Sequence, residues 1–333
     1  MMEEVERARE RLENIRSVKP ILGGLRTISL GSWQLALKRR STVQNYAGYL
    51  EAMLPWLVPH LRTAPGIIVR LRERVSLPRI LPRRRGREGK TSFQRRHVKA
   101  LVIGSERGLC GRFNVAVTEE AERYLRRESS RGSAIELLVL GSRAQRILRR
   151  RGYEPTEVGL LSMTALPSLS MAFNLARKWL RAYEERDLDG VDVIYNAYRG
   201  TGTYEPKVVQ LIPPELPTGE APLAREAAEP ETRIEETTTA QRGRTWPAPI
   251  IDTDPESLYA TVVEQSTSVR LYELLLDSAA AEHSTRFQLM ESATQNADRL
   301  IEELTLVIQT ARRQEITQEM QELATGAGLV GRE

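Results

Sequence analysis

The residues STRFQLMESATQNADRLIEELTLVIQTARRQEITQE, at positions 284–319, decide the fold of this chain. They lie inside a longer stretch, residues 256–325, that contains neither glycine nor proline. Asp254 and Pro255 precede this stretch as an N-cap candidate and a first helical residue, and Gly326 follows it. At 1.5 Å per residue, a continuous helix of this length would reach roughly 105 Å. A compact chain of this size has a radius of gyration of only about 20 Å, so we expect the helix to project from the globule.

Apolar and small residues recur along this predicted helix at alternating steps of three and four. That spacing is typical of a left-handed coiled coil, whose seam must face a second helix. The residues of the seam are Phe287, Met290, Thr294, Ala297, Ile301, Leu304, Ile308 and Ala311. The N-terminal part of the chain supplies a partner, because apolar residues recur there at steps of three and four as well. They are Val5, Ala8, Leu12, Ile15, Val18, Leu22 and Leu25. We therefore predict two long terminal helices that pair antiparallel.

Three residues argue against a regular N-terminal helix. Pro20 lies inside it, and Gly23 and Gly24 follow closely. A proline in a helix interior costs about 3 kcal/mol and a glycine about 1 kcal/mol relative to alanine. We therefore expect a kink or a local break near Pro20.

The middle of the chain alternates between short apolar runs and amphipathic segments. Four runs have the length and composition of buried strands, at residues 98–104, 135–140, 191–198 and 207–212. Three segments between them are predicted helices, at residues 115–127 with Asn114 as N-cap, 142–151 and 169–186. Strands that alternate with helices favour a mostly parallel sheet covered on both faces. The predicted fold class is therefore α/β, with the α/β domain inserted between two long helices.

Composition divides the chain into five segments. Arginines crowd residues 70–99, and glutamates and prolines crowd residues 213–245, so both regions are predicted loops. The predicted segments are an N-terminal coiled-coil helix (1–60), a basic linker (61–97), the α/β domain (98–212), a Pro/Glu-rich insertion (213–250) and a C-terminal coiled-coil helix (251–333).

Cysteine and histidine, which many nucleophilic sites and zinc sites need, are scarce. Cys110 is the single cysteine, and there are three histidines. This excludes an intrachain disulfide and nearly excludes a Cys/His zinc cluster. The basic run Arg83–Arg87 could bind nucleic acid or anionic lipid, but aromatic residues make up only 5% of the chain, which favours a solvated loop. We expect no catalytic residue, no metal and no cofactor.

Three glycines, at positions 104, 108 and 111, lie between the first predicted strand and the first predicted helix of the domain. They could cradle a phosphate, but their spacing fits neither G-x-G-x-x-G nor a Walker A motif. A tight turn where two backbone segments pass closely is the favoured interpretation. We expect Cys110, within this loop, to be a small buried side chain rather than a nucleophile. We expect His283 to be solvated on the face of the long helix.

Three segments of the chain resemble the gamma subunit of F-type ATP synthases, in the order that this family has them. Residues 293–307 (ATQNADRLIEELTLV) and 311–319 (ARRQEITQE) are similar to the family's C-terminal helix. Residues 105–114 (SERGLCGRFN) resemble its second signature, and residues 15–19 (IRSVK) resemble its N-terminal helix. The resemblance implies a Rossmann-like α/β domain between N- and C-terminal helices that pair as an antiparallel coiled coil.

The resemblance also implies a function, that of the central rotor shaft. The coiled coil would stand inside a hexamer of alternating alpha and beta subunits, and the globular foot would sit on the c-ring beside the epsilon subunit. Flow of protons or sodium ions would turn the ring, and the shaft would drive the catalytic beta subunits without being an enzyme itself. The resemblance places the chain on the cytoplasmic face of a bacterial plasma membrane, with no nucleic acid and no direct membrane insertion.

Contact residues carry over from the family where its motifs match. The implied beta-subunit contacts are Arg26, Arg312, Arg313, Gln314, Thr317, Gln318 and Glu319. The turn that contains Asp252 and Asp254 resembles the part of the foot near the c-ring. One segment departs from the family, which has a Lys/Met-rich helix after Val18. Here residues 20–31 read PILGGLRTISLG, and Arg26 is their single basic residue.

Three other hypotheses stay open. One, which this departure motivates, is a divergent gamma-like paralogue that serves another assembly, or an ATPase with altered regulation. A second is a coiled-coil protein that binds nucleic acid through the basic run, with a steep salt dependence. A third is a nucleotide-binding enzyme that uses residues 104–111, for which a nucleotide should raise the melting temperature.

Overall fold

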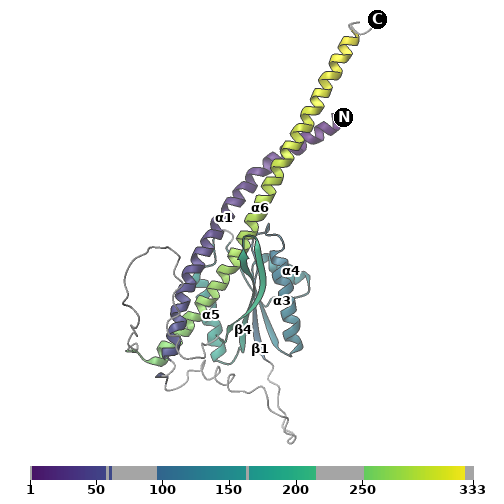
Figure 1. The fold of residues 1–333 in the computed structure, drawn as a ribbon. Coiled ribbons are helices and arrows are strands. Elements are labelled where there is room, and N and C mark those ends of the chain that lie inside the picture. The colour runs from purple at the N-terminus through teal and green to yellow at the C-terminus, as the bar shows by residue number, and fades with distance from the viewer. Residues whose placement is uncertain (1, 58–59, 62–95, 163–164, 215–250, 327–333) are drawn as a thin grey trace, which may run out of the picture.

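The computed structural model describes residues 2–57, 60–61, 96–162, 165–214 and 251–326 (Figure 1). Two long helices run side by side and carry a globular domain at one end. The elements in chain order are α1 (Met2–Leu57), β1 (His97–Ile103), α3 (Phe113–Ser130), β2 (Ala134–Leu140), α4 (Ser142–Arg150), β3 (Glu157–Gly159), α5 (Leu169–Glu184), β4 (Gly190–Gly200), β5 (Thr203–Ile212) and α6 (Pro255–Gly326). The predicted loops 61–97 and 213–250 fall almost wholly outside the described residues.

Helix α6 begins and ends where its sequence signals predict. Pro255 is its first residue, and the Asp254 carboxylate accepts a hydrogen bond from the backbone N–H of Ser257 at 2.9 Å. The predicted N-cap is therefore confirmed. The helix continues without interruption to Gly326 and extends well beyond the globular domain (Figure 1).

Helix α1 is also continuous, from Met2 to Leu57, so the predicted break near Pro20 is wrong. The helix lies against α6 on both sides of the proline. Lys19 pairs with Asp298, and Arg26 Nη1 lies 2.7 Å from Glu291 Oε2. We attribute the continuity to this pairing, because tertiary packing routinely outweighs local propensity.

The two helices pair antiparallel, as predicted. Four polar contacts across the pair share one register, because each advances along α1 by as many residues as it retreats along α6, whereas the Tyr46–Gln265 hydrogen bond departs from it. The steps are seven, fourteen and four residues through Lys19–Asp298, Arg26–Glu291, Arg40–Asp277 and Gln44–Glu273. The two helices therefore stay in one register between Lys19 and Gln44 of α1, and α1 crosses α6 toward its N-terminus (Figure 1).

The globular domain holds a five-stranded sheet in the order β3-β2-β1-β4-β5. The first four strands are mutually parallel, and β5 pairs antiparallel with β4 at one edge. The mostly parallel sheet is therefore confirmed. Strand β3 was not predicted, since its three residues are too few to show a period.

Helices cover both faces of the sheet, which makes the domain a three-layer α/β structure. On one face, α3 and α4 pack through Tyr124, Ala121 and Leu148 against strand residues such as Val102. On the other face, α5 and α6 pack through Trp179 and Leu275. The same core includes Leu50, Leu54 and Leu57 of α1. The shaft therefore shares one hydrophobic core with the globular domain.

The expected cap of the first domain helix is wrong. Arg112 occupies the N-cap position of α3 and makes no side-chain capping bond. The amide of Asn114 faces the preceding loop, where its Oδ1 accepts a hydrogen bond from the Ser105 N–H at 2.9 Å. The asparagine thus organises the loop after β1 and not the start of the helix.

Candidate functional site

The projecting end of α6 carries six of the residues that the sequence indicated as partner contacts. All six are exposed: Arg312, Arg313, Gln314, Thr317, Gln318 and Glu319. Thr317 donates to the carbonyl of Arg313 at 2.8 Å, and Gln318 donates to Glu322 at 3.1 Å, so both side chains also bind within the helix. The guanidinium groups lie at the surface, where they suit carboxylate or carbonyl partners.

Large apolar side chains are exposed at the same end of α6. Ile316, Met320 and Leu323 follow steps of four and three, and Leu323 has a relative exposure of 71%. A groove of ≈ 430 Å³ lies beside them, between the start of α1 and α6, with Val5 and Arg9 in its wall. Apolar ridges flanked by cations are typical of protein contact surfaces.

Arg26 lies apart from these residues. Its guanidinium is half-buried against α6, where it binds Glu291. Arg312 is 21 residues further along the helix than Glu291, which corresponds to about 30 Å. The structure therefore does not gather the predicted partner contacts into one patch.

The predicted foot residues lie at the opposite end of α6. Asp254 is the N-cap of the helix, and Asp252 is an exposed residue of the preceding segment. The Asp254 carboxylate thus has a structural role, because it caps α6.

The loop after β1, residues 104–112, is the tight turn that the glycines predicted. A Cβ on Gly104 would lie 2.3 Å from the Cβ of Ala144 in α4. Gly111 has a φ of +57°, in the left-handed region that glycine adopts most readily. Leu109 shares that region with a φ of +60° and is exposed. The loop is therefore compact and held in an unusual backbone conformation.

Cys110 and His283 lie on either side of the place where this loop meets α6. Cys110 is buried, as expected, and burial raises the pKa of its thiol. A raised pKa leaves little thiolate at neutral pH, which argues against a nucleophile. His283 is half-buried rather than solvated, so that expectation is wrong. Burial, with Arg286 and Arg107 nearby, lowers the pKa of His283 to about 4.

Three charged residues at this contact were missed from the sequence. Arg286 and Glu282 form an ion pair of 2.5 Å on the buried side of α6, and Glu106 lies buried in the loop after β1. The only signal was an Arg four residues after a Glu, a spacing that more often marks a solvated helix face.

Two kinds of site are absent from the described parts of the chain. No group of three or more His, Cys, Asp or Glu side chains among these residues could hold a metal ion. None of the described helices has a segment long and apolar enough to cross a membrane.

The fold and the shaft together define a stalk protein, a two-helix rod with an α/β domain inserted between its helices. A family model described as "ATP synthase" matches residues 4–329. The ATP synthase gamma chain of Granulibacter bethesdensis is 26% identical over 324 residues, which are 96% of this chain and 97% of that one. The gamma chain of a Synechococcus species is 28% identical over 328 residues, 96% of each chain. This chain belongs to the ATP synthase gamma family.

Solved structures have the same fold. A chain of the Euglena gracilis mitochondrial ATP synthase, in a structure titled as OSCP, F1 and c-ring, superposes with a TM-score of 0.56 at 15% identity. The superposition covers 100% of this chain and 98% of that one.

Proposed function

We propose that this chain is the central-stalk rotor subunit, gamma, of an F-type ATP synthase. Its task would be to couple rotation of the c-ring, driven by ion flow, to ATP synthesis or hydrolysis in a hexamer of alpha and beta subunits. The observation that carries the proposal is the antiparallel two-helix shaft, in which α6 extends past the end of α1, in a chain that matches the family over residues 4–329. The epsilon subunit and the c-ring would bind the globular domain.

The shaft would act by contact alone. A rod that is different on each side makes different contacts with three copies of the same catalytic subunit. Its orientation then favours a different conformation in each copy, and turning the rod moves these preferences from one copy to the next. The chain itself makes and breaks no covalent bond in this proposal, because the catalytic sites would lie on the beta subunits. It would be held at the cytoplasmic face of a bacterial plasma membrane by its partners.

The exposed end of α6 supplies the contacts in this proposal. Arg312 and Arg313 would bind carboxylates or carbonyls of the beta subunits, and the amides and hydroxyl that follow would add neutral hydrogen bonds. Arg26 already binds Glu291 of α6. To contact a beta subunit, it must leave Glu291 or share its guanidinium between the two partners. We therefore assign the larger share of the beta contacts to α6 and a smaller share to Arg26. Asp252, which is exposed beside the α6 cap, stays a proposed contact toward the c-ring.

Co-expression with the alpha and beta subunits of the same organism tests the proposal. We expect a complex with one copy of this chain per hexamer and ATP hydrolysis that depends on it. Arg313→Ala and Gln314→Ala should lower turnover, roughly tenfold if each removes about 1.4 kcal/mol of coupling. Arg150→Ala removes an exposed arginine of α4 and serves as the matched control, with turnover unchanged. A folded chain that forms no complex would refute the proposal.

A further inference from the structure

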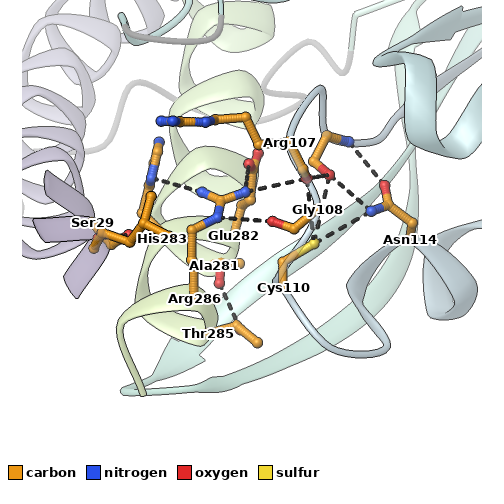
Figure 2. A network of polar contacts seen from close by, with 12 residues as sticks. Ser29, Arg107, Gly108, Cys110, Asn114, Ala281, Glu282, His283, Thr285 and Arg286 are labelled. Atoms are coloured by element: carbon orange, nitrogen blue, oxygen red, sulfur yellow. Dashed lines mark hydrogen bonds and ion pairs between the residues drawn. The ribbon is translucent and has the colours of Figure 1, made fainter. Parts of the chain in front are cut away.

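The side chain of Arg286 joins α6 to the loop after β1 (Figure 2). It is 3% exposed, and its guanidinium points from α6 into the loop. The Nε atom donates to the carbonyl of Gly108 at 3.1 Å, and Nη2 donates to the carbonyl of Arg107 at 3.4 Å. Two donors on one rigid plane, bound to two consecutive carbonyls, fix both the position and the direction of the contact.

The charge of Arg286 is balanced on its own helix. Nη2 also lies 2.5 Å from the carboxylate of Glu282, and Nη1 lies 3.2 Å from Nδ1 of His283. Burying an ion pair costs desolvation energy that apolar residues of the same size would not cost. Such a pair gives little net stability, and its directional bonds instead select one arrangement of the parts that it connects.

The loop that Arg286 binds is itself held from three other sides. The Glu106 carboxylate accepts hydrogen bonds from the N–H of Ser142 at 3.2 Å and of Leu161 at 2.9 Å. Asn114, in the first turn of α3, donates to the hydroxyl of Ser105 at 2.8 Å. These bonds tie the loop to the start of α3, the start of α4 and the segment after β3. Arg286 therefore grips a rigid part of the globular domain.

This contact lies at the edge of the sheet where α/β folds usually bind their ligands. The loops after β1, β2 and β3 all meet at the carboxyl ends of the parallel strands, which is the usual binding edge. A cavity of ≈ 30 Å³ lies there between the loop after β1 and α6, and its walls include Glu106, Glu282 and His283. Helix α6 therefore packs closely against this part of the edge.

Arg286 also lies where α6 leaves the globular domain. Gln288 and Leu289 still lie next to Gly202 and Gly111. From Glu291 onward, the polar contacts of α6 with another element are those with α1 among the described residues. Most buried α6 residues before this point, such as Leu275, pack through apolar contacts, which are not directional. Asp277, nine residues before Arg286, is an exception, since the backbone of Tyr198 and the side chain of Tyr195 in β4 bind its carboxylate. At the exit itself, the bonds of Arg286 are directional, and they resist rotation of the helix relative to the domain.

We propose that Arg286 is a positioning residue that sets the torsional stiffness of the joint between the shaft and the globular domain. A stiff joint keeps the angle of the shaft equal to the angle of the domain, so that rotation applied at one end is delivered at the other. This consequence rests on the proposed rotor function, whereas the stiffness itself is a property of the chain alone.

The test measures the joint first in the free chain. Spin labels are placed at two exposed positions, Arg150→Cys on α4 and Glu303→Cys on α6, in a Cys110→Ala background. The double variant Glu282→Gln/Arg286→Met removes the bonds to the loop without leaving a lone buried charge. We expect the distribution of label-to-label distances to broaden about twofold, because the directional contact is lost while apolar packing remains.

Arg299→Met, at an exposed shaft arginine, is the matched control and should leave the width of the distance distribution unchanged. An unaltered width in the folded double variant overturns the proposal.

A second measurement uses the complex with the alpha and beta subunits. With the hexamer fixed, the angular fluctuations of a probe on the globular domain report the torsional stiffness. We expect the double variant to keep unloaded ATP hydrolysis within about twofold of the parent while its stiffness falls by about half. The single variant Arg286→Lys keeps the charge but not the planar set of donors. Its stiffness should lie between that of the parent and that of the double variant. If the parent chain forms no complex, the proposed rotor function is refuted. The spin-label measurement on the free chain then still tests whether Arg286 sets the stiffness of the joint. Parent-like stiffness in an assembled double variant counts against the proposal.

Discussion

Gly104 directly follows β1, at a point where no side chain fits. Its missing Cβ would lie 2.3 Å from the Cβ of Ala144 and 3.3 Å from the carbonyl oxygen of Leu140, and neither atom is at the end of a flexible side chain. Gly104→Ala should therefore force α4 away from the sheet and lower the free energy of unfolding by about 1–3 kcal/mol. Chemical denaturation measures the effect.

Gly31→Ala provides the opposite control. Gly31 lies exposed in α1, and nothing lies within 4 Å of its missing Cβ. The change should raise stability by about 0.5–1 kcal/mol, the difference in helix propensity. If the two changes altered the free energy of unfolding equally, the close approach of Ala144 to Gly104 would not affect stability.

His283 should make the fold sensitive to mild acid. Burial lowers the pKa of His283 to about 4, from an ordinary value of 6.5. Between these pH values the unfolded chain binds a proton that the folded chain does not, so stability falls as the pH falls. The contribution is fully present above pH 6.5 and is lost on approach to pH 4, a total of about 3 kcal/mol.

Comparison of the parent chain with His283→Gln isolates this effect. Glu282 and Asp277 also titrate with raised pKa values, because of burial, but they are present in both proteins. The difference in unfolding free energy between parent and variant should therefore change by about 2–3 kcal/mol between pH 7 and pH 4.5. A pH-independent difference would mean that water solvates His283 in the folded state.

Single residues were the hardest feature to predict from the sequence. The burial of Cys110 and the close approach at Gly104 follow from residue type alone. Arg286, Glu282 and Asn114 do not, because their roles depend on which segment passes beside them. The contact between α6 and the loop after β1 joins residues about 178 positions apart, as the Arg286–Gly108 bond shows, and no local pattern encodes it.

At the scale of the elements, Pro20 offers a direct test of why α1 stays intact. Pro20 is exposed, so its replacement removes no packing. Pro20→Ala restores a backbone N–H and relieves the clash with the preceding turn, and should stabilise α1 by about 2–3 kcal/mol. Hydrogen exchange of the amides in residues 10–30 measures the gain locally. We expect slower exchange in Pro20→Ala. Unchanged exchange would mean that the pairing with α6 already offsets the whole free-energy cost of the proline.

Periodicity predicted the long elements well and the short ones poorly. Both shaft helices and their antiparallel pairing follow from steps of three and four in two distant segments, because a seam must find a partner. The four longer strands and three domain helices were predicted to within a few residues. Strand β3 was missed because three residues have no period, and the break at Pro20 was predicted wrongly because local propensity omits the partner helix.

At the scale of the whole molecule, the register of the shaft defines where its free end begins. Met2 lies 17 residues before Lys19, so the matching position on α6 is 17 residues after Asp298, at Glu315. The α6 residues from 316 onward thus extend past the end of α1. The side chains described there are exposed up to Leu323. This free end includes Thr317, Gln318 and Glu319 of the proposed beta contacts.

Removal of residues 316–333 should leave the stability of the chain almost unchanged and lower ATP hydrolysis by the complex. The described part of this segment is eleven helical residues, or about 16 Å of shaft, whereas the intact 72-residue helix spans about 108 Å. Small-angle scattering should give the parent chain a maximum dimension above roughly 105 Å and the truncated chain one shorter by about that 16 Å. The melting midpoint should change by less than about 2 °C, since the described side chains of this segment are exposed up to Leu323. ATP hydrolysis by the complex should fall by more than it does in Arg313→Ala alone, because several proposed contacts are lost together. A large drop in the melting midpoint would instead mean that α6 folds back on α1, and the free end would then lose its role as the contact surface.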